Sequence, residues 1–283
     1  GLPSHEADLR RFSIPFSEVR PSISPDGRHV AYRADERLWV RDLDSETPRE
    51  IPGGKAAGGY YSDTGYYLTW SPDSQSIVFP AGNELRRVSI LQGGSATTVC
   101  ALPGGRISGR QIGGLAWSGD GETIVFSRYQ AGVYEVAARG GSPTLLWKQD
   151  HADDVFLVDT PQGRAIVYAV LTPQPGHAIM VHRPDGQEEK IAQIDSSWPE
   201  LQYSPSGHIL FRKSPTENPS IWALPFSATT LRADGAPFLV VRSGQGMSLA
   251  QDGTFVYLDT GRIARQFLAW RDLSGRLLGQ ARE

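Results

Sequence analysis

The stretch Ser71-Pro72-Asp73-Ser74-Gln75-Ser76-Ile77-Val78-Phe79, preceded by Trp70, decides the fold of this 283-residue chain. It joins a turn to a strand. Proline presets φ, the Asp side chain bonds its own backbone, and Gly in other copies accepts a positive φ. The β-branched and aromatic residues that follow are typical of a strand. The stretch therefore predicts one β-hairpin.

Versions of this stretch return along the whole chain. Strong copies are Ser24-Pro25-Asp26-Gly27 and Ser118-Gly119-Asp120-Gly121, and weaker copies begin at Thr160, Ser204 and Gln251. Their last turn residues stand at positions 27, 74, 121, 163, 207 and 253, so the spacings are 47, 47, 42, 44 and 46 residues. A period in the forties indicates a repeat architecture.

Each copy carries more than a hairpin. A third apolar run follows it, as in Leu38-Trp39-Val40 or Ile221-Trp222-Ala223-Leu224, and a weaker fourth run closes most copies, as in Thr97-Thr98-Val99-Cys100. Four short antiparallel strands in about 45 residues form one propeller blade, and a lone blade cannot bury both faces of its sheet. We therefore expect an all-β fold, a six-bladed β-propeller of four-stranded antiparallel blades, with almost no helix.

The repeat also predicts a single domain, although length alone would allow two. The expected blades cover approximately residues 18–54, 55–104, 105–149, 150–195, 196–242 and 243–283. Residues 11–16 alternate in hydropathy, and Pro15 favours an edge strand, so the segment 9–17 is predicted to close the ring against the sixth repeat. Leu277-Leu278 fits either the last strand of the sixth blade or the start of a further element.

Composition narrows the function. The 31 Gly and 20 Pro suit many turns, and an aromatic share of 10% supplies large residues between blades. A net charge of −3 with dispersed Lys and Arg disfavours nucleic acid as a partner. No apolar run approaches the 18 or more residues of a membrane span, so no direct membrane insertion is expected. The single cysteine, Cys100, excludes an internal disulfide and fits a buried strand position.

The sequence offers no catalytic motif. It has no Gly-x-Ser-x-Gly elbow, no Walker A loop and no His-Glu-x-x-His pair. Its glycine pairs are expected in turns between strands and not at helix starts, which makes phosphate binding improbable; they are 93–94, 104–105, 113–114 and 140–141. We therefore predict a protein that is not an enzyme and has no cofactor.

Residues 150–154, Asp-His-Ala-Asp-Asp, are the one cluster in the sequence with several metal-ligand residue types. We interpret it as a solvated acidic loop and predict no metal site. His29 and His208 occupy comparable repeat positions, which favours a structural role. His177 and His182 flank a strand with an apolar middle and are expected on the surface.

The loops that lead into the innermost strands are expected to gather at one face, around the central channel. They mix aromatic, arginine and carboxylate side chains, the types enriched at binding hot spots. The candidate binding residues are Arg20, Tyr66, Tyr67, Arg110, Asp153, Asp154, Trp198, Glu200 and Gln245. For Tyr66, Tyr67 and Trp198 the alternative is packing between blades.

The Ser-Pro-Asp-Gly turn followed by Val-Ala-Tyr or Ile-Val-Phe resembles the TolB-like family of WD40-like (PD40) propeller repeats. Further segments look like the propeller attached to bacterial membrane-tethered serine/threonine kinases, notably of acidobacterial type. They are Arg11-Phe12-Ser13-Ile14-Pro15, Leu38-Trp39-Val40-Arg41-Asp42-Leu43, Cys100-Ala101-Leu102-Pro103-Gly104-Gly105-Arg106, Val133-Tyr134-Glu135-Val136-Ala137-Ala138-Arg139-Gly140-Gly141 and Trp270-Arg271-Asp272-Leu273-Ser274-Gly275-Arg276. The resemblance implies a periplasmic or extracytoplasmic sensor or interaction module. The kinase motifs themselves are absent from this sequence.

Three functions stay open at this point. We expect a non-catalytic module that binds a protein or peptide, as a monomeric domain or as part of a larger assembly. A second possibility is the gating propeller of a prolyl-oligopeptidase-type peptidase without its catalytic domain. The third is a propeller polysaccharide lyase, which would need a His-rich metal site.

Overall fold

The computed structural model describes residues 20–34, 37–45, 47–54, 67–91, 95–104, 112–173, 176–196, 199–214 and 219–260, and the backbone of strands 267–271 and 277–280. None of these residues is helical. The described ranges accordingly contain no helix able to cross a membrane. The predicted ring-closing segment 9–17 lies outside them.

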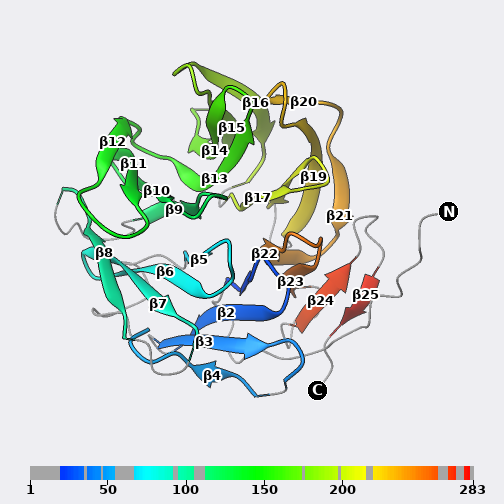
Figure 1. Cartoon of the computed structure of the whole chain (residues 1–283). Coiled ribbons are helices and arrows are strands. Elements are labelled where there is room, and N and C mark those ends of the chain that lie inside the picture. The colour runs from blue at the N-terminus through cyan, green and yellow to red at the C-terminus, as the bar shows by residue number, and fades with distance from the viewer. Residues whose placement is uncertain are drawn as a thin grey trace.

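The described strands form antiparallel sheets set around a common centre (Figure 1). The first sheet has the order β1 (Ser22–Ile23), β2 (His29–Ala34), β3 (Arg37–Asp42), β4 (Arg49–Glu50). The second has the order β5 (Thr69–Trp70), β6 (Ser76–Ala81), β7 (Glu84–Ser89), β8 (Thr97–Ala101). The third has the order β9 (Ile112–Trp117), β10 (Thr123–Arg128), β11 (Gly132–Ala137), β12 (Thr144–Trp147).

The second half of the chain repeats this plan. The fourth sheet has the order β13 (Asp153–Thr160), β14 (Gly163–Leu171), β15 (His177–His182), β16 (Glu188–Ile194). In the fifth, β17 (Leu201–Ser204) and β18 (His208–Lys213) lead to β19 (Ser220–Ser227), which pairs with both β20 (Arg232–Ala233) and β21 (Phe238–Val241). A further sheet has the order β22 (Gly244–Leu249), β23 (Phe255–Asp259), β24 (Phe267–Arg271), β25 (Leu277–Gln280).

The chain is therefore an all-β propeller of four-stranded antiparallel blades. Five blades are clear, and the sheet of β22 to β25 is described in part, because the residues that link β23, β24 and β25 fall outside the described ranges. Leu277 and Leu278 belong to β25, which pairs with β24 and is the outer strand of this sheet.

The first strand of each sheet lies towards the centre, as β5, β9, β13, β17 and β22 show in Figure 1. Each contacts the next one along the chain, and β22 contacts β1. Two hydrogen bonds join the same sheets: Gln251 N donates to Pro25 O at 3.0 Å, and Ile23 N donates to Ser248 Oγ at 2.9 Å. The first blade and the last sheet are thus neighbours in space.

The repeated turn has the geometry that the sequence predicts. Ser71 Oγ accepts the N–H of Ser76 at 2.9 Å and donates to Asp73 Oδ1 at 2.5 Å, while that oxygen accepts the N–H of Gln75 at 3.0 Å. Ser74 takes the positive φ of 61° at the position where most copies have glycine. The Ser71 hydroxyl and the Gln75 N–H lower the pKa of Asp73, because both bond its charged form. The turn satisfies its own polar groups.

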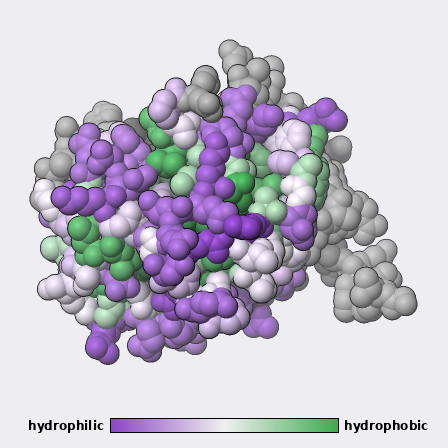
Figure 2. Space-filling model, turned by 90° about the horizontal axis from the view of Figure 1, so that it is seen from above, coloured by the Kyte–Doolittle hydropathy of each residue, from purple (hydrophilic) through white to green (hydrophobic). Residues whose placement is uncertain are grey.

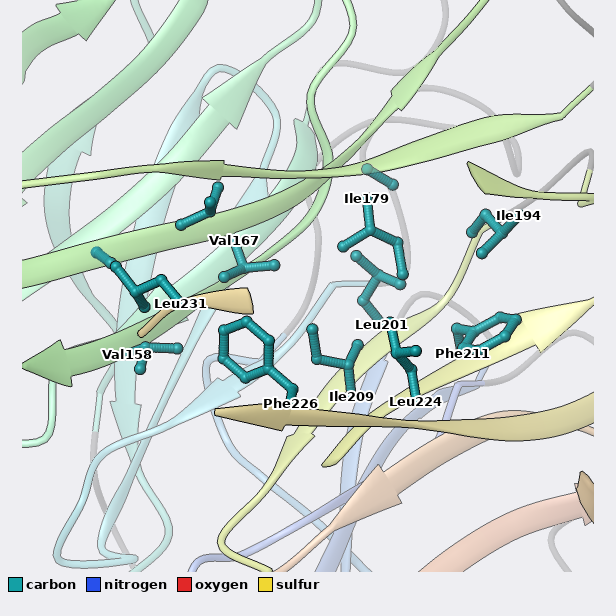
Figure 3. Close-up of a cluster of buried hydrophobic side chains, with 13 residues drawn as sticks. Val158, Val167, Ile179, Ile194, Leu201, Ile209, Phe211, Leu224, Phe226 and Leu231 are labelled. Atoms are coloured by element: carbon teal, nitrogen blue, oxygen red, sulfur yellow. The ribbon is translucent and has the colours of Figure 1, made fainter. Parts of the chain in front are cut away.

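Apolar side chains fill the space between neighbouring blades. Figure 3 shows the largest example, where Val167 and Ile179 of the fourth blade face Ile209 and Phe226 of the fifth. These four side chains are almost fully buried. Burying one such side chain stabilises a fold by about 1.5–3 kcal/mol, so the contacts between blades hold the ring together.

The rim is more polar. Figure 2 shows mainly hydrophilic residues on one side of the molecule, with hydrophobic residues in separate patches. The outer strands carry some exposed hydrophobic side chains, among them Leu145 and Leu146 on β12 and Phe238 and Leu239 on β21.

Some smaller predictions are settled by the packing. Cys100 is buried in β8, as expected, and burial raises the pKa of its thiol to about 11. His29 and His208 make structural contacts, since His29 Nδ1 lies 2.7 Å from Asp42 Oδ1 and His208 Nδ1 lies 3.0 Å from Ser206 Oγ. The prediction that glycines 113–114 form a turn is wrong, because both are buried within β9.

Candidate functional site

The starts of the innermost strands meet at the centre of the ring. A cavity of about 70 Å³ lies there, and its walls come from all of the first strands or the residues just before them. Its lining is Arg20, Pro21, Ser22, Tyr67, Leu68, Leu115, Asp154, Val155, Glu200, Leu201, Gln202, Met247 and Ser248. Four of the predicted binding residues are among them: Arg20, Tyr67, Asp154 and Glu200. We refer to these four residues as the central site.

Arg20 is the hub of the central site. Its Nη1 donates to Asp154 Oδ1 at 2.7 Å, and its Nη2 lies 3.6 Å from Glu200 Oε1. The guanidinium carbon stands 5.2 Å from the centre of the Tyr67 ring, within the range of a cation–π contact. Burial opposes the charge on Arg20, but Asp154, Tyr67 and Glu200 outweigh it and raise its pKa above the ordinary value. Arg20 stays charged.

Glu200 gathers donors from other parts of the ring. Its Oε2 accepts the backbone N–H of Gly246 at 2.6 Å and that of Met247 at 3.4 Å. Its Oε1 accepts a hydrogen bond from Arg212 Nη1 at 3.4 Å, in addition to the ionic contact with Arg20. Only 7% of its side chain is exposed. Glu200 therefore ties β17 and β18 to β22 and to Arg20, two residues before β1.

A bulge at the start of β13 positions Asp154. The pairing of β13 with β14 shifts register between Asp153 and Phe156, and Asp154 has a φ of 48°. Two glycines of β9 give the bulge room. A Cβ on Gly113 would lie 2.2 Å from Ala152 O, and a Cβ on Gly114 would lie 2.3 Å from Val155 N. Bulges often redirect a side chain next to a functional site. Here one brings the Asp154 carboxylate to Arg20.

Asp153 lies apart from the central site. Its Oδ2 is 3.8 Å from His177 Nε2, and His177 Nδ1 donates to Ser196 O at 2.7 Å. The prediction of a surface position for His177 is therefore wrong, since only 5% of its side chain is exposed. Its ring lies between Asp153 and Ser196, contacts that the local pattern around His177 does not reveal. His182, by contrast, is partly exposed and stacks on Trp147 with ring centres 4.0 Å apart.

The predicted solvated loop at residues 150–154 is only partly solvated. Asp150 is exposed, but Asp153 and Asp154 are buried because β13 begins at Asp153 and turns both into the protein. His151 packs edge-on against Tyr129, with ring centres 4.8 Å apart. Across the described part of the chain, no three His, Cys, Asp or Glu side chains come together as metal ligands.

The remaining predicted residues divide into two groups. Gln245 is partly exposed in β22, at the register shift of that strand, and does not line the cavity. Tyr66, Arg110 and Trp198 lie outside the described residues. Tyr67 packs against the core beneath it, as the packing alternative expects, and its ring also carries Arg20. Its role in binding stays a prediction.

Two contributors were missed from the sequence. Arg212 lies on β18, a second strand, and Gly246 offers only its backbone N–H. Gly246 has a φ of 60°, and its place in the register shift of β22 turns its N–H towards Glu200. A Gln-Gly pair at the start of an innermost strand is a weak signal for such a bulge. Arg212 gives no such signal, since strand arginines are common on surfaces.

Comparisons with known proteins support the fold. No family model and no curated protein matches the sequence. Among solved structures, the chain is similar to TolB from Acinetobacter baumannii, with a TM-score of 0.64 and 15% identity over 96% of this chain and 63% of that one. The chain thus spans less than two thirds of the length of that TolB.

Two further structures differ in their described roles. The tricorn protease matches with a TM-score of 0.61 and 14% identity, over 92% of this chain and 25% of that one. Regucalcin from Agrobacterium tumefaciens, a calcium-binding protein, matches with a TM-score of 0.55 and 17% identity, over 80% of this chain and 79% of that one. Identities this low reflect a shared fold, and the chain is structurally similar to TolB-like β-propellers.

Proposed function

We propose that this chain is a non-catalytic binding or sensor module that recognises a protein or peptide at its central site. The observation that carries the proposal is the convergence of Arg20, Tyr67, Asp154 and Glu200 on one cavity, from four different blades. Arginine and tyrosine at the centre of a surface are the residues most enriched among binding hot spots.

The size of the cavity supports a macromolecular partner. Sites for cofactors and drug-sized ligands enclose about 300–1,000 Å³. The central cavity has about 70 Å³, which suits one side chain or one chain end of a partner that rests on the surrounding loops. A partner of this kind would bury the loop face and insert a single group.

We further propose that the ring has six blades, with β22 to β25 as the sixth. The contact between β22 and β1 supports this count, because it leaves no space for another blade between them. The role of residues 9–17 as an added closing strand stays a prediction. Deleting residues 1–17 tests it: a lower melting temperature is expected, and an unchanged one would exclude the closing strand.

The module is proposed to act outside the cytoplasm, either alone or attached to a membrane-tethered kinase. The support is the resemblance of the sequence segments named above, together with the similarity to the TolB fold. The intact mass and the cell fraction of the native gene product test this. A membrane-bound product far larger than this chain would support the kinase attachment, and a cytoplasmic product would contradict the location.

Selection from a random peptide library tests the binding function. Peptides enriched on the wild-type protein should lose binding to the Arg20→Ala variant. Arg37→Ala is the matched control, because Arg37 is an exposed arginine that pairs with Glu50 on the first blade, away from the cavity. Peptides that bind the wild type and both variants equally would contradict the central site as the place of recognition.

A second candidate is the gating propeller of a peptidase. The similarity to the tricorn protease favours it, since this chain covers only a quarter of that protein. A Gly-x-Ser-x-Gly sequence in a domain encoded beside this one would identify the peptidase. In that case peptides should bind only weakly and without preference at the central site.

A further inference from the structure

The polar groups of the central site differ in how many hydrogen-bond partners they already have. Glu200 already receives two backbone N–H groups, Arg212 and Arg20, and Asp154 Oδ1 receives the shortest hydrogen bond of Arg20. A charged guanidinium has five N–H donors. Of these, Nη1 is engaged at 2.7 Å, and Nη2 has only longer contacts, at 3.4 Å to Pro199 O and 3.6 Å to Glu200 Oε1.

The Nε of Arg20 has no hydrogen-bond partner among the described residues, and the Arg20 side chain as a whole is partly exposed. Nε and Nη2 lie on the same edge of the guanidinium. This edge is therefore the weakly engaged one, while the Nη1 side is held by Asp154. An arginine edge with two parallel N–H groups matches a carboxylate, which it binds in a bidentate manner.

The exposed fractions of the side chains also indicate that Arg20 is the group available to a ligand. The Arg20 side chain is 27% exposed, whereas the side chains of Asp154 and Glu200 are each 7% exposed. An incoming group therefore meets the arginine before either carboxylate. Its position over Tyr67 and between two anions fixes the guanidinium before anything binds.

We propose that the central site binds a carboxylate group of the partner peptide on the Nε/Nη2 edge of Arg20. This inference rests on the proposed function and names the group that is recognised. The carboxylate can come from the C-terminus of the partner or from an Asp or Glu side chain. A cavity of about 70 Å³ holds a few water molecules, and a carboxylate with its methylene group displaces them.

The test uses the full chain labelled with ¹⁵N-arginine and follows the Nε–H signal of Arg20, which is assigned by its loss in Arg20→Lys. Three probes are compared: N-acetylglycine with a terminal carboxylate, N-acetyl-aspartate α-amide with a side-chain carboxylate, and neutral N-acetylglycinamide. Carboxylate probes are expected to shift the signal with a Kd on the order of 1 mM, the range of very small ligands. The stronger of the two identifies the source of the carboxylate.

Arg20→Lys is the informative variant, because it keeps the charge and loses the planar edge. It should remain folded, as its melting curve will report. In a calorimetric titration, which needs no Arg20 signal, it should bind the preferred carboxylate at least about 10-fold more weakly than the wild type. Arg37→Lys, at the exposed ion pair with Glu50, should bind it as the wild type does. Equal binding by Arg20→Lys, an equal shift with N-acetylglycinamide, or no saturable shift would overturn the proposal.

The outcome separates this inference from the proposed function. Selected peptides that depend on Arg20, lack acidic residues and bind equally well with an amidated C-terminus would overturn the carboxylate and leave peptide binding in place. Failure to select any Arg20-dependent peptide would overturn the proposed function, and the peptide partner of this inference with it.

Discussion

The two ends of the innermost strands are built by different means. At the end where these strands turn into the second strands, Ser71, Asp73 and Ser76 bond within six residues of each other, and similar bonds recur around Ser24 and Ser118. At the other end, Arg20 reaches Asp154 across 134 residues, and within the described ranges no other blade copies this contact. The repeated end builds the blade, and the unrepeated end is free to differ. The proposed binding function uses the unrepeated end.

Among these variants, Glu200→Ala should lower the free energy of unfolding most, because Glu200 has the most hydrogen-bond and ionic partners at the unrepeated end. The change leaves two backbone N–H groups and two arginines without their common acceptor. Removing one partner of a buried ionic network costs about 3 kcal/mol or more. Urea unfolding measures the loss. Glu50→Ala, which removes an exposed partner of Arg37, should cost less than about 0.5 kcal/mol. A loss below about 1 kcal/mol in Glu200→Ala would contradict the network.

Gly114→Ala should cause the second largest loss of stability, because it disturbs the bulge that positions Asp154. The added methyl group would meet Val155 N at 2.3 Å, and backbone cannot give way as a flexible side chain does. Overpacking of this kind costs about 1–3 kcal/mol. Gly119→Ala is the matched control, since its nearest neighbour, Asp159 Oδ2, would be 3.4 Å away. Thermal unfolding of the two variants compares them. Equal melting temperatures would mean that β9 moves freely away from β13.

Ser71→Ala tests the repeated end and should have a smaller effect. It removes the acceptor of the Ser76 N–H and the donor to Asp73, in a turn that stays closed through the backbone bond from Ser74 N to Ser71 O. One hydrogen-bonded hydroxyl contributes about 1 kcal/mol. Ser89→Ala, whose hydroxyl accepts an exposed bond from Leu91 N, is the control with little expected change. Denaturant titration of both variants gives the difference, and an equal loss would mean that the turn hydroxyl has no special role.

The smallest effect is expected from the pH response of the exposed turn carboxylate Asp120. The Ser118 hydroxyl, the Glu122 N–H and Arg164 lower its pKa to about 2. The folded chain therefore resists protonation of Asp120 more than the unfolded chain, whose ordinary Asp pKa is about 3.9. This contribution is complete above about pH 4 and is lost as the pH falls towards 2.

Melting temperatures between pH 5 and 2 check this, at values spaced closely enough to define a slope (about half a pH unit). The Asp120→Asn variant should lose less melting temperature on acidification than the wild type. Added salt should reduce the part that comes from Arg164, because that ion pair is exposed. Identical slopes for wild type and variant would show that the turn does not depend on the charge of Asp120.

The sequence was sufficient for the blades because their signals are local. The turn at Ser71 needs only residues 71–76, and a period in the forties needs only several such turns. The central site was predicted in outline for a related reason: the order of strands in a blade tells which loops reach the centre. The contacts within the site depend on distant partners, and Arg212 was missed because a second strand gives no reason to look inward.

Two errors have the same origin. The predictions for His177 and glycines 113–114 rest on their neighbours in sequence. Their surroundings are decided instead by the approach of β9 to β13 and by the contacts of His177 with Asp153 and Ser196. Gly113 has an ordinary strand conformation, so no turn signal is involved. Gly113 is needed because it has no side chain at a point where the backbones of β9 and of the residues before β13 nearly touch. Only the neighbouring blade could have disclosed that requirement.

The pair of Arg20 and Asp154 also has a mechanical consequence. Around the ring, β1 and β13 are separated by two innermost strands on either side, β5 and β9 on one and β17 and β22 on the other. The ion pair therefore links innermost strands on opposite sides of the ring. Without this link, blades on opposite sides of the ring would move relative to each other more easily. Any ligand that weakens this ion pair would let blades all around the ring open more often. Amide hydrogens in blades far from the ligand would then exchange faster.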